Sequence, residues 1–442
     1  MGIIILIIAA VIEVAFGAYC IVTQSNQKSI RSWVRIGVFA AFVLFTLVSL
    51  ITWSFRWELL AALLLVWAII GGVSLIRKKA DKKAFKAVRI VFKGIFMFLM
   101  VVIAVTPALI FPQYELPEMT GEHTVKTQVV TYTDNNRIET FNDTGENRKV
   151  TVEFWYPGDA DESYPLVVFS HGAFGVMASN TSTYQELASN GYIVCSISHP
   201  YHSFYTIDTE GKFTMVDQSF MKAVADLNNG VYDDATSYKM SQEWLKLRTD
   251  DMNFVLDTII KNAKDKGSDK IYQLVDTEKI GLFGHSLGGA ASAKLGRERQ
   301  DIDAVINLDG DLLGEVVDFV NGKEVINEAV YPVPILSIYS DAMKQAMDSI
   351  TDQNIVFPQK LISATAPHAY EVYITGTNHM SLTDLPLVSP FLVNMISGTI
   401  KKSGSGQEAD KYDVINTMNS EVLEFFNCYL KGEGSFDSAG TY

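Results

Sequence analysis

The chain has 442 residues, of which 48% are hydrophobic and 19% are charged, and its 36 basic and 50 acidic side chains give a formal net charge of −14. This length exceeds that of one small domain, and the mean hydropathy of +0.15 is high for a chain that is soluble throughout. Residues 1–111 hold 12 Lys and Arg against 3 acids, a net charge of +9, so residues 112–442 carry −23. Nucleic acid is a poor partner for this acidic part, because phosphate binding needs concentrated Lys and Arg.

Four apolar stretches fill the first part of the chain. Each approaches the roughly 18 to 20 residues that a helix needs to cross about 30 Å of hydrocarbon, where a helix satisfies its own backbone groups. We therefore predict a transmembrane region over residues 1–111 with four spanning helices. A cleaved leader is the weaker interpretation, because the first stretch has no basic start and three more stretches follow it. The stretches cover residues 3–22, 36–55, 59–76 and 94–111.

The basic residues between these stretches predict an orientation. The first and third loops hold most of them, namely Lys28, Arg31 and Arg35 in the first loop and the segment 77–86 in the third. Lys and Arg near span ends stay on the cytoplasmic side, so the N-terminus and residues 112–442 are expected outside the cytoplasm, at the cell membrane. Glu13 lies near the middle of the first span, where we expect no basic partner and a neutral carboxyl hydrogen-bonded to a neighbouring helix.

Beyond residue 111, short strand-like runs alternate with helical ones. This order favours an α/β domain over residues 112–442 with a mainly parallel sheet flanked by helices. A polar, aromatic-rich insertion at about residues 200–267 suits a lid or substrate wall, although its long helix, 243–264, is better interpreted as a packing helix. The predicted strands cover residues 124–132, 150–155, 166–169, 192–198, 280–283, 304–308, 334–339 and 370–375, and the final helix covers residues 410–430.

The most informative motif is Gly-His-Ser-Leu-Gly-Gly at residues 284–289. It follows an apolar strand and precedes a helical run, which is the strand, turn and helix context of a nucleophile elbow with Ser286 as nucleophile. Glycines are expected on either side of the turn, because larger residues would collide with neighbouring chain. The helix N-terminus beneath Ser286 also favours developing negative charge.

A serine nucleophile needs a histidine base, and the histidine needs an acid to fix its tautomer. With such an elbow the chain order is serine, acid, histidine, which selects His379, in a loop after the last strand. Two acids follow strands at suitable places, Asp309 and Asp341, and spacing alone leaves both open. The remaining histidines precede the domain, lie upstream of Ser286, or sit in the elbow or before a strand: His123, His171, His199, His202, His285 and His368.

An oxyanion hole requires two backbone N–H donors. One is expected from Leu287, the residue after the nucleophile, and the second from Ala173, in the glycine-containing loop that follows strand 166–169. His199 and His202 form an H-x-x-H pair without an obvious third ligand, so we interpret them as pocket-lining residues and expect no metal.

These motifs together resemble the platelet-activating-factor acetylhydrolase branch of the α/β-hydrolase family. The resemblance covers roughly residues 124–430 and implies an α/β-hydrolase fold, with Asp309 favoured over Asp341 as the acid. It also implies hydrolysis, without metal or cofactor, of an ester with a short acyl chain, of the 1-alkyl-2-acetylglycerophosphocholine type. The matching segments are 165–172, 247–251, 279–290, 307–309 and the loop around His379.

The resulting hypothesis is a membrane-anchored serine esterase or lipase of lipid metabolism, with Ser286, His379 and Asp309 as the triad and Ala173 and Leu287 as the oxyanion donors. Its expected partners are an ester or lipid substrate and the membrane. The alternatives are a broad carboxylesterase or polyester hydrolase, a membrane acyltransferase, and a non-catalytic lipid sensor. Acyl length and headgroup cannot be predicted from these residues.

Overall fold

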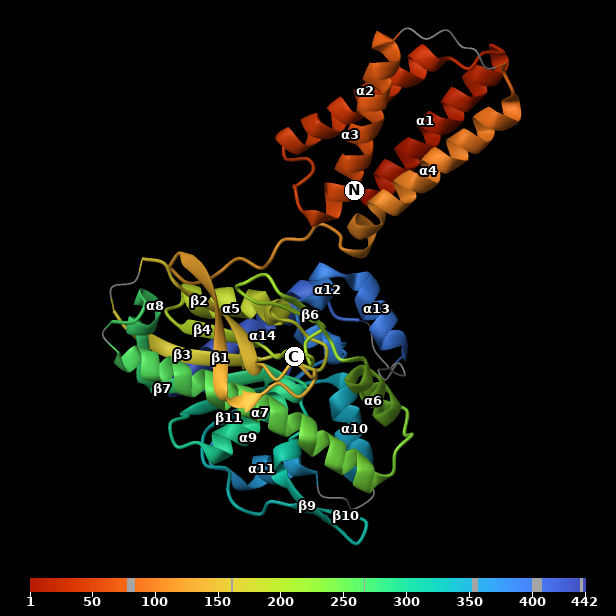
Figure 1. Ribbon diagram of the computed structural model, residues 1–442. Helices are drawn as coiled ribbons and strands as arrows, with labels where there is room; N and C mark the ends of the chain where they lie inside the picture. The colour runs from red at the N-terminus through yellow and green to blue at the C-terminus, as the bar shows by residue number, and fades with distance from the viewer. Residues whose placement is uncertain (78–83, 160–161, 266, 352–356, 400–407, 438–439) are drawn as a thin grey trace. The chain divides into compact units, whose positions relative to one another are not determined.

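The structure is a computed structural model that describes residues 1–77, 84–159, 162–265, 267–351, 357–399, 408–437 and 440–442 (Figure 1). The chain divides into two compact units. The first comprises Met1–Glu115 with Leu387–Ile396, and the second comprises Leu116–Pro386 with Ser397–Tyr442.

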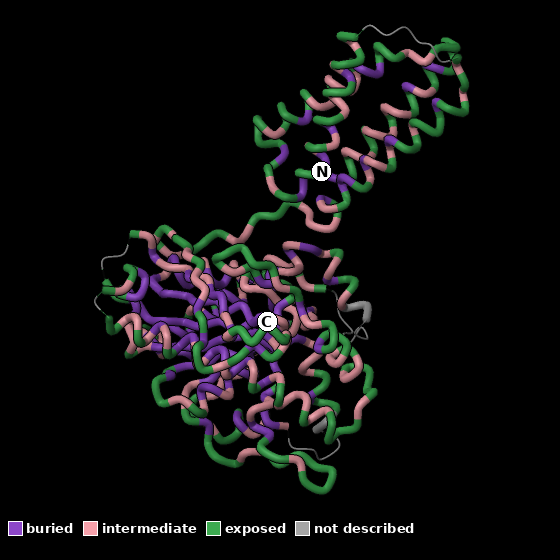
Figure 2. Tube along the Cα trace, viewed as in Figure 1, coloured by how far each residue is buried: buried purple, intermediate pink, exposed green. Residues whose placement is uncertain are grey.

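Four described helices of the first unit are long and apolar enough to cross a membrane by length and composition. Figure 2 shows exposed and intermediate residues along most of their length, as expected of helices that face lipid. The predicted bounds of the second span were wrong, because that helix begins well before residue 36. The helices are α1 (Gly2–Val22), α2 (Lys28–Leu47), α3 (Phe55–Ile76) and α4 (Ala87–Ile110). Part of the basic third loop, residues 78–83, lies outside the described residues.

The early start of α2 also corrects the expectation for Glu13. Arg31 was assigned to a loop, but it lies in the first turn of α2, where its Nη1 atom is 3.4 Å from Glu13 Oε2. The guanidinium also lies over the ring of Phe16, 4.2 Å from the ring centroid. Glu13 therefore has a basic partner inside the helical bundle, and a basic side chain that enters a bundle needs such partners.

The strands of the second unit follow the expected pattern closely. The predicted strand at residues 304–308 is reproduced without change, and most others differ by one to three residues at an end. The strands of the main sheet are β1 (Val125–Ile138), β2 (Asn147–Pro157), β3 (Tyr164–Ser170), β4 (Ile193–Ser198), β7 (Val275–His285), β8 (Ala304–Leu308), β11 (Ile335–Ser340), β12 (Ala369–Ile374) and β13 (Gly440–Thr441). Two hairpins lie outside it, β5 (Tyr205–Ile207) with β6 (Phe213–Met215), and β9 (Val316–Val320) with β10 (Lys323–Ile326).

The helices of this unit include a long one, α7, that begins nine residues before its predicted start. Asp233 caps it by accepting a hydrogen bond from Thr236 N at 2.8 Å. The helices are α5 (Thr181–Ser189), α6 (Gln218–Asn228), α7 (Asp234–Lys264), α8 (Lys270–Gln273), α9 (Leu287–Glu298), α10 (Asp341–Thr351), α11 (Pro358–Thr365) and α14 (Lys411–Phe426). Residues 387–396, which belong to the first unit, include the end of α12 (Leu385–Val388) and most of α13 (Pro390–Thr399). Single turns are η1 (Met177–Asn180), η2 (Leu313–Glu315) and η3 (His379–Leu382), and a π-helical turn, η4 (Asn427–Lys431), follows α14.

Among the described residues, the main sheet has nine strands in the order β1-β2-β4-β3-β7-β8-β11-β12-β13. The strands from β4 to β13 pair in parallel, whereas β2 is antiparallel to both β1 and β4. This confirms the predicted mainly parallel sheet. The carboxyl ends of parallel strands meet at one edge, which is where open α/β sheets place their ligand sites.

Apolar cores cover both faces of this sheet, as the uninterrupted apolar strands predicted. In β3, Leu166 and Val168 join the core beneath α7 and α9, whereas Val167 and Phe169 join the core beneath α5 and α14. Successive side chains of a strand point to opposite faces, so a strand buried on both sides must be apolar throughout. Helices flank the sheet in Figure 1, and Figure 2 shows the buried residues concentrated along its strands.

Candidate active site

Ser286 lies between β7 and α9, at the sharp turn that the motif predicted. Its backbone angles are φ 55° and ψ −123°, a conformation that non-glycine residues rarely adopt and that stores strain at functional sites. A Cβ atom on Gly284 would overlap the backbone of Gly288, and one on Gly288 would overlap the carbonyl of Ser170. The glycines are therefore needed for the close approach of strand, turn and helix that leaves Ser286 half-buried.

The structure brings His379 and Asp309 together. Asp309 directly follows β8, His379 begins the turn η3 after β12, and His379 Nδ1 lies 2.7 Å from Asp309 Oδ2. The carboxylate also accepts hydrogen bonds from Ser340 N at 2.7 Å and Ser340 Oγ at 2.9 Å. Burial raises the pKa of Asp309, but the hydrogen bond and charge of His379 and the hydrogen bonds from Ser340 together lower it below its ordinary value.

Burial of His379 by itself lowers the pKa of its imidazole. The hydrogen bond and the charge of Asp309 outweigh it, so the pKa of His379 lies above its ordinary value. The Asp309 contact places the proton on Nδ1 when the ring is neutral, which leaves Nε2 able to accept a proton. This is the tautomer that a general base next to a serine requires.

Asp341, the other acid that the sequence left open, has a different partner. Its Oδ2 atom accepts a hydrogen bond from Gly376 N at 2.8 Å. Gly376 has φ +70°, and it lies in the loop that leads from β12 to His379. Asp341 therefore anchors the start of this loop, whereas Asp309 contacts the imidazole itself.

The elbow and the histidine meet through the residue before the nucleophile. His285 Nε2 donates a hydrogen bond to the carbonyl oxygen of His379 at 2.8 Å, and the two ring centroids are 4.5 Å apart. Among the described residues, no hydrogen bond joins Ser286 Oγ to His379. Such bonds are often long without substrate and tighten in the reacting complex.

The two candidate oxyanion donors are brought together as well. Ala173 and Leu287 share one small apolar cluster with residues of the insertion. A Cβ atom on Gly172 would lie 3.1 Å from the Cβ of Ser286, so the loop backbone runs directly beside the nucleophile. The next amide in the loop, Phe174 N, is already used, because it donates to His202 O at 3.1 Å. Leu287 is the first residue of α9, where amides lack intrahelical acceptors.

The insertion forms a wall beside this loop. Val216 and Phe220 are buried in the cluster that holds Leu287, with Ala173 and Phe174 packed against it. The long helix α7 instead packs against α9 and the sheet, as the packing-helix interpretation expected.

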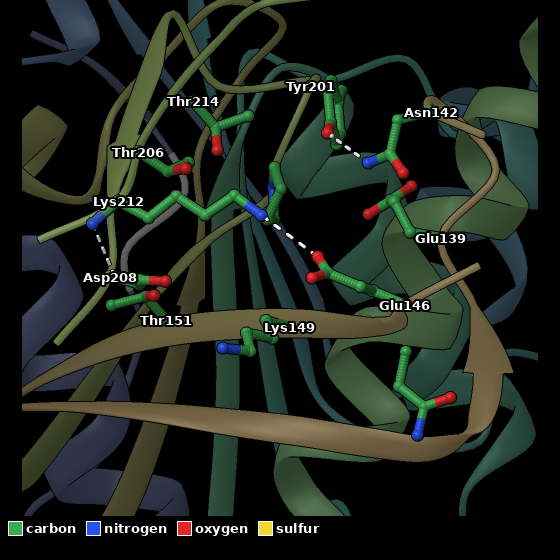
Figure 3. A pocket seen from close by; sticks show the side chains of 12 residues that line it. Glu139, Asn142, Glu146, Lys149, Thr151, Tyr201, Thr206, Asp208, Lys212 and Thr214 are labelled. Atoms are coloured by element: carbon green, nitrogen blue, oxygen red, sulfur yellow. Dashed lines mark hydrogen bonds and ion pairs between the residues drawn. The ribbon is translucent and has the colours of Figure 1, made fainter. Parts of the chain in front are cut away.

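A separate polar pocket lies where the insertion hairpin faces the turn between β1 and β2 (Figure 3). Lys212 reaches across it to Glu146 at 3.2 Å, and Asn142 Nδ2 donates to Tyr201 OH at 2.8 Å. Neither Ser286 nor the pair formed by His379 and Asp309 lines this pocket. Its lining residues include no serine, cysteine or histidine, so we do not place the chemistry there.

A second serine, histidine and aspartate chain lies behind the oxyanion loop, and the sequence did not reveal it. Ser170 Oγ is 2.9 Å from His199 Nε2, and His199 Nδ1 is 3.0 Å from Asp251 Oδ2. All three side chains are fully buried. Burial, followed by the charge of Arg248, lowers the pKa of His199 to about 3, so this imidazole is neutral. A substrate cannot reach these groups, which gives the chain a structural role next to the loop.

The H-x-x-H pair belongs to this buried region too. His202 stacks on Phe220 with ring centroids 3.8 Å apart, and both His199 and His202 are buried. The expectation that they line a substrate pocket is wrong for His199, which is held between Ser170 and Asp251, and stays a prediction for His202, whose ring stacks on the wall residue Phe220. Within the described residues, no cluster of His, Cys, Asp and Glu has the arrangement of a metal site.

Comparison with known proteins shows the family of this chain. The family model described as platelet-activating factor acetylhydrolase, isoform II, matches residues 151–440. The chain is 24% identical over 302 residues to the platelet-activating factor acetylhydrolase of Cavia porcellus, covering 65% of this chain and 63% of that protein. It is 25% identical over 296 residues to the enzyme of Canis lupus familiaris, covering 62% and 59%. The chain thus spans about three fifths of the length of these curated relatives.

A solved structure shares the fold. The ferulic acid esterase from Streptomyces cinnamoneus superposes with a TM-score of 0.55 and 20% sequence identity, over 74% of this chain and 96% of that one. At this identity the likeness concerns the fold, a mainly parallel sheet with flanking helices. The family match over residues 151–440, by contrast, includes the elbow, Asp309 and the loop that carries His379, so this chain belongs to the platelet-activating factor acetylhydrolase, isoform II, family.

Proposed function

We propose that this protein is a serine hydrolase of carboxylic esters that uses Ser286, His379 and Asp309. The observation that carries the proposal is the strained elbow of Ser286 beside a histidine that is hydrogen-bonded to a buried carboxylate at 2.7 Å. Membership of the acetylhydrolase family and the esterase fold of the structural neighbour support it.

In the proposed reaction, His379 Nε2 takes the proton of Ser286 Oγ as the oxygen attacks the ester carbonyl carbon. The carbonyl oxygen becomes an oxyanion held by the N–H groups of Ala173 and Leu287. The tetrahedral intermediate then expels the alcohol, which takes the proton from His379, and leaves an acyl group on Ser286. Water, deprotonated by His379, releases the acid and restores the serine.

We further propose that the substrate is a lipid ester, such as a phospholipid with a short acyl chain. The family description supports this class, and so does the apolar wall formed by Val216, Phe220 and Leu287 next to the elbow. An apolar wall beside a few convergent polar groups is the usual composition of a site for an amphipathic ligand.

We also propose that residues 1–111 anchor the protein in the cell membrane, with residues 112–442 as the extracytoplasmic hydrolase domain. The support is the length and composition of the four helices, together with the basic residues of the first and third loops. The charge of −23 does not attract the catalytic domain to anionic lipid, so the anchor has to supply proximity to a membrane substrate.

The test is hydrolysis of a fluorogenic ester panel, from acetyl to palmitoyl, by the full chain and by Ser286→Ala. We expect the variant to lose on the order of 10⁴-fold or more in kcat, whereas the control Ser435→Ala, an exposed serine, keeps wild-type activity. Retained turnover by Ser286→Ala would refute the nucleophile. Product analysis with lipid acceptors separates hydrolysis from acyl transfer, and the absence of turnover from every ester would favour a lipid sensor.

A further inference from the structure

Arg248 is a fully buried cation that touches the candidate oxyanion loop. It lies in α7 with no exposed surface, and it is among the largest fully buried side chains of the described residues. Its Nη1 atom donates to the carbonyl of His171 at 2.6 Å, and its Nη2 atom donates to the carbonyl of Gly172 at 3.1 Å. The planar fork of a guanidinium suits such a paired contact.

The partners of this guanidinium are unusual for a buried charge. Within the described part of the chain, no carboxylate forms an ion pair with Arg248, and its other polar neighbours are His202 Nδ1 at 3.4 Å and Ser170 Oγ at 3.5 Å. Burial lowers the pKa of Arg248 to about 9, so the side chain is still charged near pH 7. A buried cation without a direct counterion is costly, and such a cost points to a role beyond packing.

The buried acid whose charge acts on Arg248 is Asp251, which other groups already occupy, including Arg137 Nη2 at 2.9 Å from its Oδ1 atom. Asp251 receives two hydrogen bonds of 2.7 Å from Arg148, one to each carboxylate oxygen, and contacts His199 at 3.0 Å. These contacts satisfy the carboxylate of Asp251, so Arg248 forms its hydrogen bonds with the loop carbonyls instead. The buried serine, histidine and aspartate chain therefore supports the geometry in which Arg248 meets backbone.

The contact to Gly172 O bears directly on the candidate oxyanion hole, because this carbonyl and the N–H of Ala173 belong to one peptide unit. The same carbonyl accepts a second hydrogen bond, from His171 Nδ1 at 2.7 Å. A carbonyl can only accept, so His171 carries its proton on Nδ1, and its Nε2 accepts from Ser203 Oγ at 2.7 Å. Two donors on the oxygen of a peptide make its N–H a stronger donor and fix its direction.

We propose that Arg248 is a positioning residue that orients and polarises the Gly172–Ala173 peptide so that the Ala173 N–H binds the oxyanion. The inference rests on the proposed function, because this N–H acts as an oxyanion donor only if Ser286 attacks an ester. Arg248 touches neither the substrate nor Ser286, and it acts through the peptide. The positive charge of Arg248 next to the loop also favours the negative charge of the oxyanion.

The test compares Arg248→Lys and Arg248→Ala in the full chain. Lysine keeps the charge but offers a single ammonium in place of the fork, so we expect a kcat loss smaller than that of alanine. For alanine we expect a loss on the order of 10- to 100-fold, below the cost of deleting an oxyanion donor outright. KM should change by no more than about threefold, because the contact matters mainly in the transition state.

Two further measurements separate positioning from a purely structural effect. Added guanidinium at millimolar concentration should restore part of the kcat of Arg248→Ala, because it can refill the space left by the fork. The affinity for a trifluoromethyl ketone, which forms a tetrahedral oxyanion adduct on serine, should fall in parallel with kcat/KM. The matched control is Arg297→Ala, because Arg297 also donates to two backbone carbonyls, those of Ala329 at 3.1 Å and Val330 at 3.3 Å. We expect this variant to have the kcat of the wild type.

The outcomes distinguish this inference from the proposed function. If the wild type is active and both Arg248 variants keep kcat within about twofold, or change KM alone, the positioning role is wrong and the proposed function stands. A second outcome is that Arg248→Ala loses both kcat and melting temperature and that guanidinium does not restore its kcat. If Arg248→Lys then remains folded with wild-type kcat, Arg248 has only a structural role. If the wild type neither turns over esters nor forms the ketone adduct, the proposed function fails and this inference with it.

Discussion

The Nδ1 atom of His379 lies 2.7 Å from Asp309 Oδ2, although the two residues are 70 positions apart in the chain. Each sits at the carboxyl end of its strand, Asp309 after β8 and His379 after β12, and β11 separates these strands in the sheet. Ser340, which ends β11, donates two hydrogen bonds to Asp309 and so fills the gap between them. The parallel strands thus bring both residues to one edge of the sheet, and the hydrogen bonds from Ser340 hold Asp309 next to the histidine across the end of β11.

This arrangement predicts different results for the two acids that the sequence left open. Asp309→Asn should lower kcat on the order of 10⁴-fold, because the amide cannot hold the imidazole in its active tautomer. Asp341→Asn should cost less than about tenfold, because its amide oxygen can still accept from Gly376 N. Steady-state kinetics of both variants on one fluorogenic ester checks this, and an inactive Asp341 variant beside an active Asp309 variant would reverse the assignment.

The pKa of His379 predicts the acid limb of the pH profile. His379 must be neutral to accept a proton, and Asp309 holds its pKa above the ordinary value, so kcat/KM should rise with pH through a midpoint above about 6.5. In Asp309→Asn the remaining influences on the pKa of His379 are burial, which is the largest and lowers it, and the charge of Asp311, which raises it, so the midpoint of the residual activity should move to lower pH. Profiles from about pH 5 to 9 measure both midpoints. Identical midpoints in the two proteins would contradict the coupling.

The buried carboxylate of Asp251 predicts a large effect on stability. Asp251→Asn removes the carboxylate that Arg148 and Arg137 share and leaves Glu139 as the remaining acid of Arg148, which costs up to about 3 to 5 kcal/mol and should lower the melting temperature of the full chain in detergent. The control on the same helix is Asp257→Asn, whose carboxylate is exposed and pairs with Arg299, with an expected change within about 1 kcal/mol. Similar melting temperatures for the two variants would argue against the buried network.

The pH dependence of this contribution has a defined sign. Burial raises the pKa of Asp251, but Arg148 and then His199 outweigh it, so the folded pKa lies well below the ordinary value. The ionised group therefore contributes stability above the unfolded pKa of about 4, and the contribution is lost as the pH falls toward the folded pKa. The gap in melting temperature between wild type and Asp251→Asn should accordingly narrow below about pH 4.

The proposed orientation in the membrane predicts which side of the cell carries each part of the chain. In a Cys428→Ser background, a cysteine at Asp143 should react with a membrane-impermeant maleimide on intact cells, because Asp143 is exposed in the catalytic unit. A cysteine at Ser25, between α1 and α2, should react only after permeabilisation. The reverse pattern would place the hydrolase in the cytoplasm.

Structural features that depend on residues close together in the chain, such as buried strands and the elbow, could be predicted from the sequence. Apolar runs predicted the buried strands, and the motif at residues 284–289 predicted an elbow whose glycines the geometry explains. The start of α2 was missed because Lys28 and Arg31 suggested a loop, whereas Arg31 is held within the bundle by Glu13. Tertiary contacts thus overrode the local signal for the helix start.

Features that depend on distant residues could not be predicted in the same way. Asp309 and Asp341 both follow strands, and only contacts in the folded chain, from Ser340 to Asp309 and from Gly376 to Asp341, distinguish the acid that meets His379. The segment at residues 247–251, which holds Arg248 and Asp251, contributes to the family resemblance, but the sequence predicts no role for either residue. The contacts of these residues are distant in the sequence, because Arg248 meets the carbonyl of His171 and Asp251 meets the imidazole of His199. Hydrophobic periodicity carries no signal for such contacts.

The measurement that tests the central claim most directly is covalent labelling of the wild-type chain with a fluorophosphonate, followed by mass spectrometry of the peptide that carries the adduct. We predict one adduct, on Ser286, that forms far more slowly in His379→Ala, since the imidazole must take the serine proton. An adduct on another serine, or a labelling rate unaffected by His379→Ala, would contradict the account.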